Sequence, residues 1–258
     1  MKRNYWILVA ACLIPVIAGC QQQATTNSSE KERQTMTKAR SEQTNEPISS
    51  TQESISDTTA HFAAGSLLEA VSNNNLVSVQ AILKSSDYPI NETNNQGESP
   101  LLIATHKNYI EIAKALIDAG ADINQQDHLS DSSYLYASAQ GKTEILKYML
   151  DKSNPDQQKV NRFGGNALIP AAEKGHLANV KLLLQDGQVN INHQNNYGYT
   201  ALIEAVALRD GSSVYQEIIT ELLNAGADKS LRDNTGTTAE DYAKSLGYSE
   251  MQEILAAY

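Results

Sequence analysis

Residues that could carry chemistry are spread thinly along this sequence of 258 residues. Its histidines could bind a metal or act as general bases, but none lies four residues from another histidine or a cysteine. They are His61, His106, His128, His176 and His193. The acidic residues are scattered in the manner typical of solvated helix faces. The sequence therefore predicts no catalytic residue, no metal site and no cofactor.

Three further patterns each lack a part that their chemistry would need. Gly164-Gly165 is not followed by the lysine and serine of a phosphate-binding loop. Asn190-Ile191-Asn192 lacks the ligand spacing of a calcium loop. No serine stands in a nucleophile elbow. We therefore expect a protein that is not an enzyme.

Among the reactive side chains, Cys20 has the sequence context that points most specifically to one chemical role. Cys12 and Cys20 are the only cysteines, so the chain beyond residue 20 can form neither a disulfide nor a thiolate metal site. Lys2-Arg3 gives a basic start, and an apolar run over residues 5–18 follows it. This run is shorter than the roughly 20 residues of a membrane-spanning helix. The arrangement is typical of a signal peptide.

The end of the run, Ile17-Ala18-Gly19-Cys20, resembles the lipobox of bacterial lipoproteins. In that motif small residues fit the peptidase, and the cysteine thiol accepts a diacylglycerol before cleavage leaves it N-terminal. The resemblance implies a lipoprotein signal peptide at residues 1–19, lipidation of Cys20, and a domain held on the extracytoplasmic side of a bacterial membrane. In a cell with two membranes, Gln21 in place of aspartate favours the outer one. The alternative is an ordinary signal peptide with an accidental cysteine.

Residues 20–60 are predicted to be a disordered tether. Ser, Thr, Asn, Gln and Glu dominate this segment, which has no aromatic residue and only Met36, Ile48 and Ile55 as large apolar side chains. Such a composition buries too little apolar surface to offset the entropy of ordering. The whole chain carries a net charge of −10. That charge disfavours nucleic acid as a partner and unassisted adhesion to anionic lipid.

From residue 61 onward the dominant feature is an internal repeat of 33 to 38 residues. Five successive units begin with an Asx residue three positions before a Gly or Ser, which is a type I turn pattern, whereas the first lacks a clear turn. The Asx positions are Asn94, Asp127, Asn161, Asn195 and Asp233. A helix N-cap follows each turn, at Ser99, Ser132, Asn166, Thr200 and Thr238. Alanine recurs within the first helix of every unit, which lets the neighbouring helix approach closely.

This unit resembles the ankyrin repeat, over about residues 61–258. The resemblance implies an all-α solenoid of helix–turn–helix repeats with β-turn or hairpin tips. We count six units, at 61–93, 94–126, 127–160, 161–194, 195–232 and 233–258. The family's histidine after Thr-Pro-Leu is replaced here by Leu102, Leu135, Ile169, Ile203 and Asp241.

The third unit departs most from the pattern. Ser130, Ser133 and Tyr134 stand where the repeat usually has Gly, Pro and Leu, and Pro155 interrupts the end of the unit. A poor unit in an array of nearest-neighbour contacts is expected to open first.

Stacked repeats of this kind present a face built from turn tips and first helices, which solenoid proteins use for binding. Aromatic rings are enriched at binding hot spots, and several fall on this face beside two arginines that could orient an acidic group. The candidate binding residues are Phe163, Tyr197, Tyr199, Tyr136, Arg162 and Arg232. The alternative is that these rings only pack on one another.

We therefore expect a monomeric, lipid-anchored protein that binds a protein partner as a scaffold, inhibitor or immunity-type factor. The alternative is a surface-anchored binder of a small molecule or cell-wall component. A closed, lined pocket would favour that alternative, whereas a broad open groove would favour a protein partner.

Overall fold

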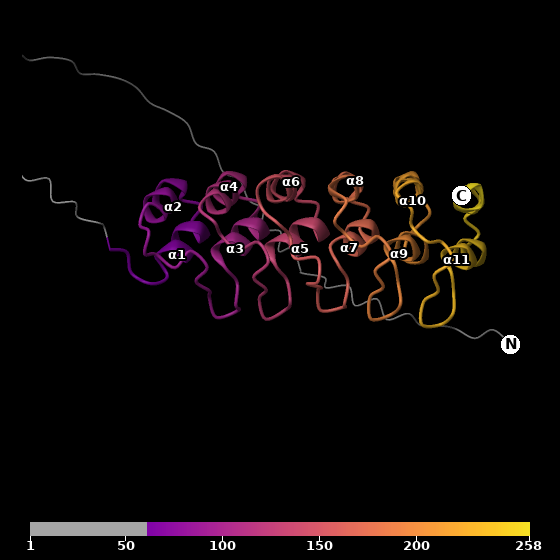
Figure 1. The fold of residues 1–258 in the computed structure, drawn as a ribbon, viewed down its shortest axis with the longest axis horizontal. Helices are drawn as coiled ribbons and strands as arrows, with labels where there is room; N and C mark the ends of the chain where they lie inside the picture. Colours follow the sequence, from indigo (N-terminus) through magenta and orange to yellow (C-terminus); the bar gives the residue numbers. More distant parts are fainter. Residues whose placement is uncertain (1–60) are drawn as a thin grey trace, which may run out of the picture. The chain divides into compact units, whose positions relative to one another are not determined.

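The computed structural model describes residues 61–258 (Figure 1), so Cys20, the predicted signal peptide and the predicted tether lie outside the described residues. The described part is a series of helix pairs, and residues 61–258 contain no β-strand. The pairs are α1 Ser66–Ser72 with α2 Leu76–Leu83, α3 Pro100–Lys107 with α4 Ile110–Asp118, α5 Ser133–Ala139 with α6 Thr143–Lys152, α7 Leu168–Glu173 with α8 Leu177–Asp186, α9 Ala201–Ala207 with α10 Ser213–Asn224, and α11 Ala239–Leu246 with α12 Ser249–Ala257. The predicted all-helical repeat fold is confirmed.

The helix pairs stack side by side in two layers. First helices form one row, second helices form the other, and long loops extend on the far side of the first-helix row (Figure 1). Each first helix packs on the first helix of the next pair, as α7 does on α9. From α3 to α11, each first helix has a fully buried alanine at the same position of the repeat, and this small side chain allows the close approach. These residues are Ala104, Ala137, Ala171, Ala205 and Ala243.

The long loops end in tight hairpin turns whose geometry follows from the Asx residues. In the fourth unit the Gly164 N–H donates to the Asn161 carbonyl at 2.8 Å. The Asn161 side-chain oxygen accepts the N–H groups of Phe163 and Gly165, at 2.9 and 3.0 Å. Successive tips are also joined, because the Asn196 N–H donates to the Phe163 carbonyl at 3.0 Å. Equivalent bonds join the His128 N–H to the Gln96 carbonyl and the Asn234 N–H to the Tyr197 carbonyl, so the tips of units 2–3 and of units 4–6 are linked by hydrogen bonds.

The predicted N-caps act as the sequence indicates. The side-chain oxygens of Ser99, Ser132 and Thr200 each accept a backbone N–H from the first turn of their helices. Asn166 does the same for α7, and Thr238 forms a full capping box with Asp241. Asp241 stands at the position of the family's histidine, so the last unit uses this position to cap its helix.

The third unit contains the strained turn. Ser130 has φ of +62°, whereas the equivalent positions in the other turns are glycines. A side chain in the left-handed region costs about 1–2 kcal/mol. The hydroxyl of Ser133 is buried with no hydrogen-bond partner among residues 61–258. Both features weaken this unit relative to the fourth.

Hydrogen exchange is therefore expected to be faster over residues 128–160 than over residues 164–190. Glycine adopts a positive φ without this cost, so Ser130→Gly should raise the free energy of unfolding by about 1 kcal/mol. The same change should slow exchange over residues 128–160 in particular. Equal protection of the two segments in the unmodified protein would refute the weakness of the third unit.

No helix within residues 61–258 is both long enough and apolar enough to cross a membrane.

Candidate functional site

Three large apolar side chains project into solvent from consecutive turn tips. Leu129, Phe163 and Tyr197 occupy the third position of their turns and are 57, 48 and 57% exposed. We call these three residues the tip row. The outer tips carry Gln96 and Thr235 at the same position. At this position of the turn, exposed apolar side chains are thus confined to the third, fourth and fifth units.

Phe163 and Tyr197 are predicted binding residues, and the structure places both in solvent. The Arg162 guanidinium lies 5.0 Å from the centre of the Phe163 ring, in a cation–π contact. Leu129 is absent from the predicted set because that set was chosen for aromatic rings. Leu129 is the third residue of its turn, as Phe163 is of the next, and this equivalence identifies it.

The candidate binding residue Tyr199 is only partly exposed. Its ring packs edge-on against Tyr242 at 6.2 Å, and the two hydroxyl oxygens lie 3.3 Å apart. The Tyr242 hydroxyl donates to Asp233 at 2.5 Å, and burial together with this bond raises the pKa of Tyr242. Tyr199 follows the turn glycine, where the chain returns toward its helix. Its side chain is therefore directed over the next unit.

Arg232 also has partners of its own. Its guanidinium donates to the Gly236 carbonyl at 2.6 Å and lies 3.5 Å from the Asp241 carboxylate. It immediately precedes the last turn, which begins at Asp233.

A cleft of about 110 Å³ lies between the third and fourth units. It brings together three of the predicted residues, Tyr136, Arg162 and Phe163, and adds Lys174. The remaining lining residues are Asp131, Ala139, Gln140, Asn161, Pro170 and Glu173. We call this the unit 3–4 cleft.

The unit 3–4 cleft is lined on the side of the fourth unit by Pro170 of α7. Pro170 is equivalent to Tyr136 of α5 and to Glu204 of α9, so the fourth unit has a shorter side chain at this inner position than the units on either side.

Charged groups surround one wall of the cleft. The Tyr136 ring packs at 4.0 Å on His106, whose Nδ1 lies 3.0 Å from Glu98. Burial raises the pKa of Asp131, and the neighbouring Asp127 raises it further, whereas Arg162 acts in the opposite direction. The inner surface here is therefore polar and ionisable, beside an exposed apolar edge.

Glu204 is a buried carboxyl group on α9, close to this surface. The Asn195 side-chain amide donates to it at 2.7 Å. Burial, and then the charge of Glu173, raise the pKa of Glu204 to about 8. Glu173 itself is paired with Arg209. Glu204 is thus protonated at neutral pH, because its ionised form is poorly solvated.

This burial predicts a pH-dependent stability. The folded pKa of Glu204 lies above the usual value of 4.5, so stability is fully present below pH 4.5 and falls as the pH rises through about 8. Each unit of pKa difference corresponds to about 1.4 kcal/mol. Glu204→Gln should unfold at a higher temperature than the parent at pH 9 and should reduce its loss of stability between pH 5 and 9. Identical pH profiles for the two proteins would contradict this assignment.

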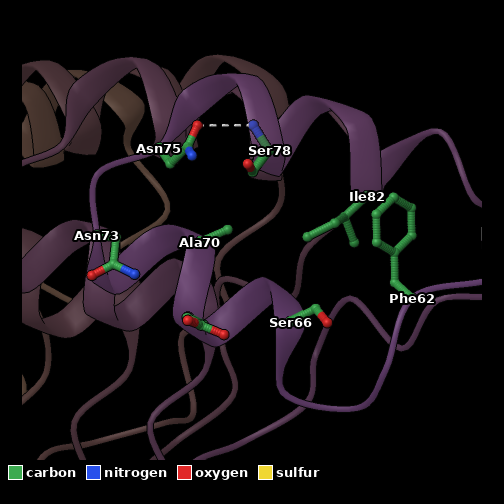
Figure 2. Close-up of a pocket in the computed structure, with 8 residues that line it drawn as sticks. Phe62, Ser66, Ala70, Asn73, Asn75, Ser78 and Ile82 are labelled. Carbon is green, nitrogen blue, oxygen red and sulfur yellow. Dashed lines mark hydrogen bonds between the residues drawn. The ribbon is translucent and has the colours of Figure 1, made fainter.

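A second hollow lies between α1 and α2, at the first end of the array (Figure 2). Its volume is about 250 Å³, and Phe62, Ala70 and Ile82 supply apolar lining. The side-chain oxygen of Asn75, which lines the hollow, already accepts a hydrogen bond from the Ser78 N–H at 3.0 Å. None of the predicted binding residues lines this hollow.

Among residues 61–258, no three histidine, cysteine, aspartate or glutamate side chains are grouped so that they could hold a metal ion. Together, the tip row and the unit 3–4 cleft form the surface that offers most to a partner.

Comparison with known proteins gives relatives for most of the chain. The family model described as ankyrin repeats (3 copies) matches residues 50–127 and 134–233. The crystal structure of the ankyrin repeat protein EF0377 is 57% identical, with a TM-score of 0.76, and the match covers 77% of this chain and 100% of that one. An ankyrin repeat domain from Acinetobacter baumannii AYE is 42% identical, with a TM-score of 0.72, over 75% of this chain and 97% of that one.

A curated relative is the putative ankyrin repeat protein YahD of Escherichia coli K12. It is 43% identical over 105 residues, which is 41% of this chain and 52% of YahD. The chain thus spans about half the length of YahD, and its match covers 8% of a human 2-5A-dependent ribonuclease and 16% of the putative ankyrin repeat protein L92 of Acanthamoeba polyphaga mimivirus.

Proposed function

Because the chain belongs to the ankyrin-repeat family, we propose that it binds a protein partner through the tip row and the unit 3–4 cleft. The family supports protein–protein interaction as the general role. The observation that carries the specific proposal is the exposure of Leu129, Phe163 and Tyr197 on three consecutive tips. Large side chains contribute nothing to the repeat core at these positions. A partner that covers them would bury a continuous apolar strip.

The size of the cleft favours a protein over a small molecule. Small-molecule sites are usually enclosed cavities of about 300–1,000 Å³, whereas the unit 3–4 cleft has about 110 Å³. A cleft of this size beside an exposed apolar edge suits one side chain of a larger partner. A small-molecule or cell-wall ligand remains the second candidate, and it would have to bind outside this cleft or remodel it.

We further propose that the domain is held outside the cytoplasm by a lipid on Cys20. The basic start, the short apolar run and the sequence Ile17-Ala18-Gly19-Cys20 support this location. There the protein would act as a scaffold, an inhibitor or an immunity-type factor for a partner at the same membrane.

The test is crosslinking in cells with a tagged full-length protein, followed by mass spectrometry. We expect one extracytoplasmic protein to be enriched over a control in which Phe163 and Tyr197 are alanine. Equal recovery of every crosslinked protein with the control would contradict binding through the tip row.

A further inference from the structure

We propose that the unit 3–4 cleft binds an aspartate or glutamate side chain from an extended segment of the partner, while apolar neighbours of that side chain lie on the tip row. This inference rests on the proposed function and adds the chemistry of the segment that is bound. The proposed occupant is an acidic peptide segment bound in an extended conformation.

The charges of the cleft favour an anion. Arg162 and Lys174 line it, and neither side chain has an ion pair or a hydrogen bond within residues 61–258. The charge of Glu173 is already offset by Arg209. Asp131 is the remaining carboxylate of the lining; burial and then Asp127 raise its pKa, whereas Arg162 and Lys174 lower it. With Glu173 paired to Arg209, the charges of Arg162 and Lys174 exceed that of Asp131 by one, in a chain whose net charge is −10.

Neutral hydrogen-bond donors complete the site. The Tyr136 hydroxyl and the Gln140 amide both belong to residues that line the cleft, and neither group is engaged by another side chain in the described part of the chain. A carboxylate has two oxygens that can accept about four hydrogen bonds. A guanidinium, an ammonium, a hydroxyl and an amide can together satisfy it, and hydrogen bonds to charged groups are the strong ones.

The spacing of the tips favours an extended segment. Packed helices lie about 8–10 Å apart, and the tip of each unit leads into its own first helix. A polyproline II segment advances about 9.3 Å over three residues, from its rise of about 3.1 Å per residue. Every third residue of such a segment can therefore reach a successive tip. An α-helix rises only about 1.5 Å per residue and would need six or seven residues for the same distance.

The surface therefore predicts a recognisable motif. Two apolar residues spaced three apart would contact neighbouring members of the tip row, and an Asp or Glu next to one of them would enter the cleft. Arg162 connects the two parts of the site, since it lines the cleft and also stacks on Phe163.

The experiment is selection of a displayed library of random 12-residue peptides on the full-length protein. Enriched peptides are then synthesised, with and without replacement of their acidic residue by the matching amide. Affinities are measured for the parent, for Arg162→Gln with Lys174→Gln, and for a control with Lys147→Gln and Lys152→Gln. The control removes the same charge from α6, in the second-helix layer.

We expect enriched peptides to carry an acidic residue beside apolar residues spaced three apart. Replacing that residue by its amide should weaken binding to the parent and to the control at least tenfold, but should have little effect on the Arg162→Gln, Lys174→Gln protein. Such coupling in a double-mutant cycle assigns the contact.

Three results would overturn the inference. Enriched peptides that need the tip row but no acidic residue would remove the carboxylate site and leave the proposed function intact, and so would a selection that enriches no peptide while crosslinking of the partner still needs Phe163 and Tyr197. If peptide binding survives Phe163→Ala with Tyr197→Ala, both the inference and the proposed function fail.

Discussion

Replacing Cys20 by alanine is expected to abolish lipid incorporation and to move the protein out of the membrane fraction. A diacylglycerol, with or without an N-acyl chain, gives the multiple acyl chains that stable anchoring needs. Cys20 is the only thiol left once the predicted signal peptide is removed. The apolar run over residues 5–18 is too short to replace the lipid as a spanning anchor. The readouts are incorporation of a labelled fatty acid and fractionation of cells before and after a high-salt wash.

Cys12→Ala is the matched control, because it removes the other thiol and leaves the lipobox-like sequence unchanged. This control should still incorporate lipid and pellet with membranes. If the Cys20→Ala protein pellets with membranes and resists the salt wash, the lipoprotein proposal is wrong.

Phe163→Ala combined with Tyr197→Ala is expected to weaken partner binding by about 100-fold or more. Truncation of an aromatic anchor at a hot spot costs about 2 kcal/mol or more, and each 1.4 kcal/mol corresponds to about tenfold in affinity. Adding Leu129→Ala should weaken binding further. Because these three side chains are about half exposed, the melting temperature should change little. Affinity for the partner found by crosslinking, measured by titration, is the readout.

Val77→Ala is the control for this prediction. Val77 lies on α2 in the second-helix layer and is 77% exposed, so its loss removes exposed apolar surface away from the tip row. Its binding should equal that of the parent. Undiminished binding by a folded Phe163→Ala, Tyr197→Ala protein would move the site elsewhere, first to residues 208–214, where the link between α9 and α10 is longer than the links within the other helix pairs.

The repeat was predictable from sequence because its signals are local. An Asx residue, a glycine three positions later and an N-cap two positions after that specify a turn and a helix start within six residues, as Asn161, Gly164 and Asn166 illustrate. Spacing of these signals along the chain then gives the stack. No long-range information is needed for either step.

Side-chain direction at the tips was only partly predictable, because it depends on neighbouring units. Tyr199 is a candidate binding residue beside Tyr197, but its hydroxyl lies against that of Tyr242, which is 43 positions further along the chain. Leu129 is exposed by the same turn geometry as Phe163 and was overlooked because it is not aromatic. Aligning the turns by position would have found it.

The unit 3–4 cleft could not be recognised from any one unit. Pro170 in its lining is smaller than the equivalent residues of the units on either side, and the lining comes from two units. The buried carboxyl of Glu204 was missed for a similar reason. The pattern of the repeat places Glu204 on an inner helix, but its burial and its raised pKa depend on Asn195 and Glu173.

The most direct test of the proposed binding surface is site-specific photo-crosslinking in living cells. A photoreactive phenylalanine analogue is placed in the full-length protein at position 163 on the tip row or at position 77 on α2. We predict that position 163 gives one discrete crosslinked species, that mass spectrometry identifies the same protein as chemical crosslinking, and that position 77 gives none. Crosslinking of that protein from position 77 and not from position 163 would contradict binding through the tip row.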